Sequence, residues 1–164
     1  MEWTTELEII VRVLLACLFG AAIGLEREFA GKAAGLRTHM MVAASAALLM
    51  SLAPPTIEQG ASATFPDAVG ADPTRIMHAI ITGISFLGAG TIIVHGGRSV
   101  EGLTTAASIL LVAALGMTTA LGAWRLAAMI TVLTLLILGG VGVLEQRIAR
   151  HRRSKPSDET DRGD

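Results

Sequence analysis

A dense group of charged residues lies between two apolar runs near the N-terminus. Residues 24–39 have the sequence GLEREFAGKAAGLRTH, in which Glu26 and Glu28 end one apolar run and Arg37 opens the next. A carboxylate between a guanidinium group and the free N–H groups of a helix start is strongly held, so it can lock two helices together or help to bind a ligand. We favour a locking ion pair, and a ligand site is the alternative.

Hydroxyl side chains occur at helical spacing in a later apolar run. Thr104 and Ser108 are four residues apart, and Thr105 lies next to the first. In an apolar environment such hydroxyls face neighbouring helices, where each hydrogen bond contributes about 0.6 to 2 kcal/mol. The same spacing also suits a polar pathway for ions, which is the alternative.

The sequence lacks the motifs of common catalytic and cofactor sites. Its four histidines show no spacing typical of metal ligands, and it contains neither a nucleophile elbow nor a phosphate-binding loop. We therefore predict a protein that is not an enzyme and has no cofactor and no metal site. The net charge of −1 gives no bulk basicity, so we predict no nucleic-acid partner.

Long apolar windows must position the charged and polar residues. Of the 164 residues, 52 % are hydrophobic and 16 % are charged, whereas about 25 % are charged in soluble proteins. A helix needs about 20 apolar residues to cross a bilayer. A soluble bundle would need polar faces, which the last three windows lack. The sequence predicts an all-α, polytopic membrane helix bundle with helices at about 7–25, 36–53, 76–94, 103–121 and 124–144.

The distribution of basic residues predicts how the bundle is oriented. Ten Lys and Arg fall in loops and tail on one side of the five helices, and two fall on the other side. Cytoplasmic loops collect Lys and Arg, so we predict an outside N-terminus and a cytoplasmic C-terminus. Residues 1–145 then form the transmembrane domain, and residues 146–164 form a basic, then acidic, disordered cytoplasmic tail. In the first helix, Arg12 is expected to pair with Glu8.

Two segments begin alike and suggest a parallel hairpin repeat. GLRTHMMVAASAALL from Gly35 and GLTTAASILLVAALG from Gly102 share the start Gly-Leu-x-Thr, and each follows a glycine-rich helix and a short turn. Chance similarity of Gly- and Ala-rich helices is the alternative. Closely spaced glycines predict close helix packing, with a smooth conduction wall as the alternative. They are Gly20 and Gly24 in the first helix and Gly83, Gly88 and Gly90 in the third.

These motifs together resemble the MgtC/SapB family of bacterial inner-membrane proteins. GLEREFAGKAAGLRTH, GISFLGAGTI from Gly83 and GLTTAAS from Gly102 occur in the family's order and with similar spacing, and the resemblance covers about residues 7–145. It implies a multi-pass protein of the bacterial cell inner membrane. The positions that match the family motifs, and that we expect to form a functional cytoplasmic mouth, are Glu26, Arg27, Arg37, Thr38, His39, Thr104 and Thr105.

The resemblance also implies a role in stress adaptation. The best-known members of the family support growth in low magnesium and survival inside macrophages, which links them to virulence, and some relatives are linked to acid stress. They are thought to act on other membrane proteins, including the F-type ATP synthase, and not to carry magnesium themselves. Several members continue into a soluble ACT-like domain after the last helix, whereas this sequence continues as a short charged tail.

The sequence therefore supports two hypotheses about function. We favour a non-enzymatic protein that lies in membrane lipid and acts by binding other membrane proteins. The alternative is a magnesium transporter or channel component. Mg²⁺ needs oxygen ligands in near-octahedral geometry, usually with one or two carboxylates, and carboxylates occur only at the edges of the apolar windows. An ion path within a homo-oligomer would also agree with the sequence.

Overall fold

The computed structural model describes the backbone of residues 3–61, 73–95 and 99–153 and most of their side chains. In these ranges the chain forms a bundle of helices, which confirms the predicted all-α fold. A short antiparallel hairpin, which was not predicted, connects the third helix to the fourth. The elements are α1 (Trp3–Phe29), α2 (Leu36–Ala61), α3 (Pro73–Ala89), β1 (Ile93–His95), β2 (Ser99–Glu101), α4 (Leu103–Ala120) and α5 (Trp124–Arg153).

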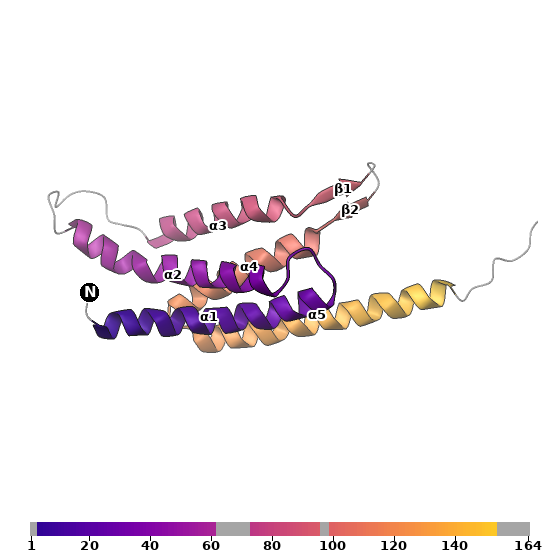
Figure 1. Cartoon of the computed structure of the whole chain (residues 1–164), viewed down its shortest axis with the longest axis horizontal. Coiled ribbons are helices and arrows are strands. Elements are labelled where there is room, and N and C mark those ends of the chain that lie inside the picture. The colour runs from indigo at the N-terminus through magenta and orange to yellow at the C-terminus, as the bar shows by residue number, and fades with distance from the viewer. Residues whose placement is uncertain (1–2, 62–72, 96–98, 154–164) are drawn as a thin grey trace, which may run out of the picture.

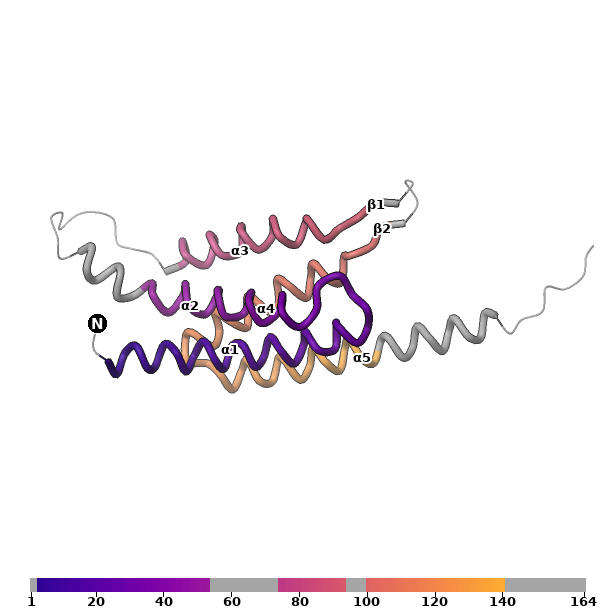
Figure 2. Tube along the Cα trace, in the orientation of Figure 1, coloured from indigo at the N-terminus to yellow at the C-terminus, as the bar shows by residue number. Residues whose placement is uncertain are grey.

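The helices run back and forth along one long axis (Figure 1). The turn between α1 and α2, the β1–β2 hairpin and the C-terminal part of α5 lie at one end, which we call the hairpin end. The start of α1, the start of α3 and the turn between α4 and α5 lie at the opposite, distal end, as the trace in Figure 2 also shows. The three segments at the hairpin end are those that the count of basic residues assigned to the same side of the membrane. The compartment that each end faces stays a prediction.

Three helices are long and apolar enough to cross a membrane, within the part of the chain that the structure describes. They are Trp3–Phe29, Leu36–Ala53 and Leu103–Ala120, and the apolar segments Thr74–Ala89 and Trp124–Gly140 are shorter. Large apolar side chains cover the outside of the bundle, for example Leu18 on α1 and Leu136 on α5. Such a surface is expected where lipid is the solvent. The chain is a membrane protein. Each of the five predicted apolar windows corresponds to one of the helices α1 to α5.

The helix bounds differ from the predicted windows at several ends. The third helix ends at Ala89 and not at residue 94, because the chain turns there and enters β1. The fifth continues from the predicted end at 144 to Arg153. Residues 145–153 contain Glu, Gln, Arg and Ala, which favour helix, and no proline. The predicted disordered tail is therefore helical over its first part, and residues 154–164 lie outside the described residues.

The core lies between α1, α2 and α4 and is built from small side chains. Ala16 and Ile23 of α1, Ala43 of α2, and Ile109 and Val112 of α4 are completely buried. Many of the other buried side chains are alanines, so the helix backbones can approach one another closely. The helices α3 and α5 pack on the outside of this three-helix core, α3 against α2 and α4 and α5 against α1 and α4.

Two predicted glycines make the contact between α1 and α2 possible. A Cβ atom on Gly20 would lie 2.6 Å from the His39 carbonyl oxygen, and one on Gly24 would lie 2.8 Å from the Leu36 Cα atom. Real Cβ atoms do not approach backbone so closely, so only glycine fits at either position. A third close approach was not predicted: a Cβ on Gly116 of α4 would overlap the Ala43 carbonyl oxygen.

The predicted packing role is wrong for two glycines of the third helix. Gly83 is exposed, and a Cβ added there would meet no described atom within 4 Å. Gly90 lies in the turn after α3, where a Cβ would approach only carbonyl oxygens of the preceding turn. Gly88 does face another helix, since its Cβ would lie 3.5 Å from that of Ala106. The reason is that α3 contacts the core along a narrow strip and leaves its other faces open.

Candidate functional site at the hairpin end

His39 is the most buried polar side chain at the hairpin end. It is the fourth residue of α2 and has no exposed surface. Its Nδ1 atom is 2.8 Å from the Gly35 carbonyl oxygen, and its Nε2 atom is 3.0 Å from the Ser108 hydroxyl of α4. The imidazole therefore ties the start of α2 to the first part of α4.

The partners of His39 determine where its protons lie. A carbonyl oxygen can only accept, so Nδ1 must donate to Gly35. In the neutral ring Nε2 then accepts the Ser108 hydroxyl proton. The same hydroxyl is 2.8 Å from the Thr105 carbonyl oxygen, to which it can donate instead. If the ring is protonated, Nε2 donates to Ser108 and Ser108 donates to Thr105. The network can thus satisfy the ring in either protonation state, by turning one hydroxyl.

An ion pair between Glu26 and Arg27 lies beside this network. Arg27 is buried near the end of α1, and its Nε and Nη2 atoms donate to the two carboxylate oxygens of Glu26, the second bond being 2.7 Å. Such a two-bond pair is among the stronger side-chain contacts. Both charges lie near enough to the His39 imidazole to act on it electrostatically.

The locking ion pair expected between a carboxylate of this stretch and Arg37 does not form. Arg37 is exposed, and no carboxylate of the described residues forms an ion pair with it. Successive helical residues are turned by about 100°, so Arg37 and His39 point about 200° apart. Because His39 faces α4, Arg37 must face outward. Glu26 is satisfied by its neighbour in sequence.

A carboxylate does hold the start of α2, as predicted, and it belongs to Glu28. Its Oε2 atom accepts a 2.7 Å hydrogen bond from the Leu36 backbone N–H. This contact occupies one of the free donors at the helix start and places a negative charge at the positive end of the helix dipole. Gly35 makes room for it, because a Cβ there would overlap the Glu28 carboxylate. The turn itself passes through Gly31, whose φ of 64° favours glycine.

The threonines of the predicted mouth have different surroundings. Thr105 is buried and offers its carbonyl oxygen to Ser108, whereas Thr104 is exposed and Thr38 is half-buried. Just before Thr104 and Thr105, Gly102 has a φ of 89°, and a Cβ there would overlap the Thr91 carbonyl oxygen. Glycine thus lets the chain pass close to the end of α3 as it enters α4.

Both Gly-Leu-x-Thr motifs begin a helix at the hairpin end. Leu36 is the first residue of α2, and Leu103 is the first residue of α4. The predicted mouth is therefore one place in the structure, formed by the end of α1 and the starts of α2 and α4. Within the ranges given above, no three of His, Cys, Asp and Glu gather closely enough to hold a metal ion.

Sequence spacing missed two contacts among the described residues that join helices far apart in the chain. One is the bond from His39 to Ser108, because spacing does not tell which hydroxyl faces which helix. The other is at the distal end, where Arg12 pairs with Glu8 as predicted and also donates from Nη1 to the Ala120 carbonyl oxygen at 2.6 Å. That carbonyl lies in the last turn of α4, where backbone oxygens lack helical partners.

Comparison with known proteins places this arrangement in a family. Residues 13–147 match the MgtC family. "Putative magnesium transporter YhiD" of Escherichia coli is 42 % identical over 132 residues, which are 80 % of this chain and 59 % of that protein. Protein SrpB of Synechococcus elongatus is 40 % identical over 87 % of this chain and 79 % of its own length. Protein MgtC of Salmonella typhimurium is 38 % identical over 77 % of this chain and 49 % of its length.

The chain thus spans about half to four fifths of the curated relatives named here. No solved structure matches it. The family match includes Glu26, Arg27, His39 and Ser108, whose contacts we together call the hairpin-end network, and the glycines that let α1, α2 and α4 approach one another. This chain belongs to the MgtC family.

Proposed function

We propose that this chain is a multi-pass protein of the bacterial inner membrane that acts without catalysis, by binding other membrane proteins. Its role is adaptation to low magnesium, to acid or to life inside a host cell, as the family resemblance suggests. The observation that supports the proposal is that the buried polar groups of the hairpin end bond to one another. Arg27 bonds to Glu26, and His39 bonds to Ser108.

A network that is satisfied internally keeps helices in place and holds a fixed surface around it. On that surface Arg37 and Glu101 are exposed, next to the turn and the hairpin. Exposed charges such as these are suited to recognition of a partner, because they can bind it without breaking hydrogen bonds or ion pairs within the protein. The F-type ATP synthase, which the resemblance suggests, is a candidate partner, and a second copy of the chain is another.

A magnesium transporter or channel component is the second candidate, favoured by the name of the relative YhiD. A Mg²⁺ ion at Glu26 would have to share its carboxylate with the cation of Arg27, since both carboxylate oxygens accept a hydrogen bond from that side chain. Mg²⁺ also keeps its waters tightly and needs nearly octahedral oxygen ligands. These two requirements place transport second.

A flux measurement separates the two candidates. The wild type, Glu26→Gln and the control Glu6→Gln, which changes an exposed carboxylate on α1, are reconstituted at equal amounts and Mg²⁺ uptake into proteoliposomes is measured. The same genes are tested for growth in low magnesium. We expect no uptake with any of the three, and a growth defect in Glu26→Gln alone. Robust uptake by the wild type that disappears in a fully folded Glu26→Gln would establish the transporter instead.

A further inference from the structure

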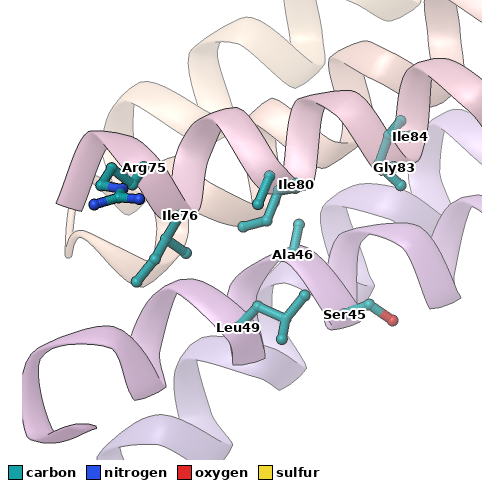
Figure 3. A pocket seen from close by; sticks show the side chains of 9 residues that line it. Ser45, Ala46, Leu49, Arg75, Ile76, Ile80, Gly83 and Ile84 are labelled. Carbon is teal, nitrogen blue, oxygen red and sulfur yellow. The ribbon is translucent and has the colours of Figure 1, made fainter. Parts of the chain in front are cut away.

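A cavity of about 380 Å³ opens between α2 and α3, away from the hairpin-end network. Figure 3 shows its wall, with Ser45, Ala46 and Leu49 on α2 facing Ile76 and Ile80 on α3. The wall is almost entirely apolar apart from one charged side chain, Arg75, at the start of α3. The volume is within the range of about 300 to 1000 Å³ that is typical of small-ligand sites.

Several of the side chains that line the cavity are small. Ser45 and Ala46 on one side and Ala79 and Gly83 on the other leave space between the two helices, beside the contact that Ile80 makes with the core. Gly83 belongs to a family motif but packs against no described residue, and a Cβ there would enter open space. Close packing between helices therefore does not explain this glycine, whereas it explains Gly20 and Gly24.

Charge and polarity together define what fits. Arg75 is exposed at the distal end, and no carboxylate of the described residues pairs with it. Gly83 follows eight residues later, so the apolar wall continues for about 12 Å along α3 toward the middle of the bundle. An occupant thus meets a cation at the end of the helix and then a wall of hydrocarbon with one hydroxyl, that of Ser45. This is the polarity of an anionic phospholipid, with its phosphate at the membrane surface and an acyl chain below.

We infer that this groove is a binding site for one anionic phospholipid. The phosphate accepts hydrogen bonds from the Arg75 guanidinium, which suits phosphate geometry. One acyl chain lies between α2 and α3 and passes over Gly83, where the absence of a side chain leaves room for it. The lipid fills the space that the small residues of the two helices leave open, and it connects α3 to the core.

Native mass spectrometry of the full chain in detergent tests this inference. Dioleoyl-phosphatidylglycerol is titrated against dioleoyl-phosphatidylcholine, and the dissociation constant of the first bound lipid is measured. We expect the wild type to prefer phosphatidylglycerol. Arg75→Gln should weaken binding of phosphatidylglycerol about tenfold and binding of phosphatidylcholine by less, because both lipids offer a phosphate to Arg75 but the choline cation of phosphatidylcholine offsets the charge of its own. Gly83→Leu should weaken binding of both lipids, because it fills the path of the acyl chain.

Two matched controls distinguish the groove from the general surface. Arg125→Gln removes an exposed arginine at the same end of the bundle, and Gly139→Leu adds the same side chain to α5, also where a Cβ meets open space. Both should bind like the wild type. Equal effects of Arg75→Gln and Arg125→Gln, or no effect of Gly83→Leu, would overturn the inference. So would conversion of a dimer to a monomer by Gly83→Leu with lipid binding unchanged, because a second copy would then occupy the groove.

Discussion

At the scale of single residues, the hairpin end distinguishes two arginines that the sequence presents as equals. Arg27 and Arg37 lie in the same charged stretch, yet the first is buried against Glu26 and the second is exposed. A buried charge needs its partner, whereas an exposed one is solvated by water or by lipid headgroups. The position of a charge on its helix, and not its distance along the chain, therefore determines its role.

This difference predicts that replacing arginine by glutamine changes the free energy of unfolding much more at position 27 than at position 37. Arg27→Gln should lower the free energy of unfolding by about 3 kcal/mol, because it leaves Glu26 partly buried without its cation. Arg37→Gln should change it by less than about 1 kcal/mol. Unfolding of the purified protein in mixed detergent micelles measures both values. Equal losses from the two variants would mean that Arg37 is also held in a buried ion pair.

At the scale of elements, the contact between α1 and α2 depends on glycines and not on large side chains. Gly20 and Gly24 bring the two backbones together over more than a turn, and this approach places His39 where Ser108 of α4 can reach it. Packing and hydrogen bonding are thus coupled: if α1 were pushed away, α2 would shift and the imidazole would lose its fixed position.

We therefore expect methyl groups to have very different effects on different helices. Gly20→Ala should lower the yield of folded protein and its melting temperature, because the new Cβ would lie 2.6 Å from the His39 carbonyl oxygen. Gly139→Ala should leave both unchanged, since its Cβ meets open space, and should even favour helix slightly. Size-exclusion chromatography and thermal unfolding compare the two. A Gly20→Ala protein as stable as the wild type would show that α1 can move away from α2 without cost.

At the scale of the whole molecule, the ends of the bundle are well separated, and the count of basic residues predicts which compartment each faces. By sequence, the loops and tail on the side of the hairpin end carry ten Lys and Arg, whereas the other side carries Arg75 and Arg125, besides Arg12 within the first helix. An excess of cations in short loops holds these loops in the cytoplasm. The hairpin-end network would then lie near the cytoplasmic surface.

Cysteine labelling in intact cells checks this orientation. In a Cys17→Ala background, single cysteines replace Lys32 in the turn at the hairpin end and Ala123 in the turn at the distal end, both of which are exposed. A membrane-impermeant maleimide should label position 123 in intact cells and position 32 only after permeabilisation. The reverse pattern would invert the topology and place the hairpin-end network outside.

Long apolar windows and charge predicted the helices and the region of the site, but not the pairs within it. The windows were found because a bilayer demands long uncharged segments. The β1–β2 hairpin was missed because Ile93 and Val94 continue the apolar run of α3. Which groups bond, such as His39 to Ser108, depends on how α2 and α4 are rotated about their axes. That rotation follows from contacts among many small residues, which spacing alone does not encode.

The bond from Arg12 to the Ala120 carbonyl oxygen has a consequence for how the protein is made. The two residues are 108 positions apart, so α1 leaves the ribosome and meets the membrane long before α4 exists. During that interval the guanidinium still has Glu8, one turn earlier on its own helix. Glu8 can thus pair with Arg12 throughout synthesis. The hydrogen bond from Arg12 to Ala120 forms only after α4 has been made, and it then joins α1 to α4.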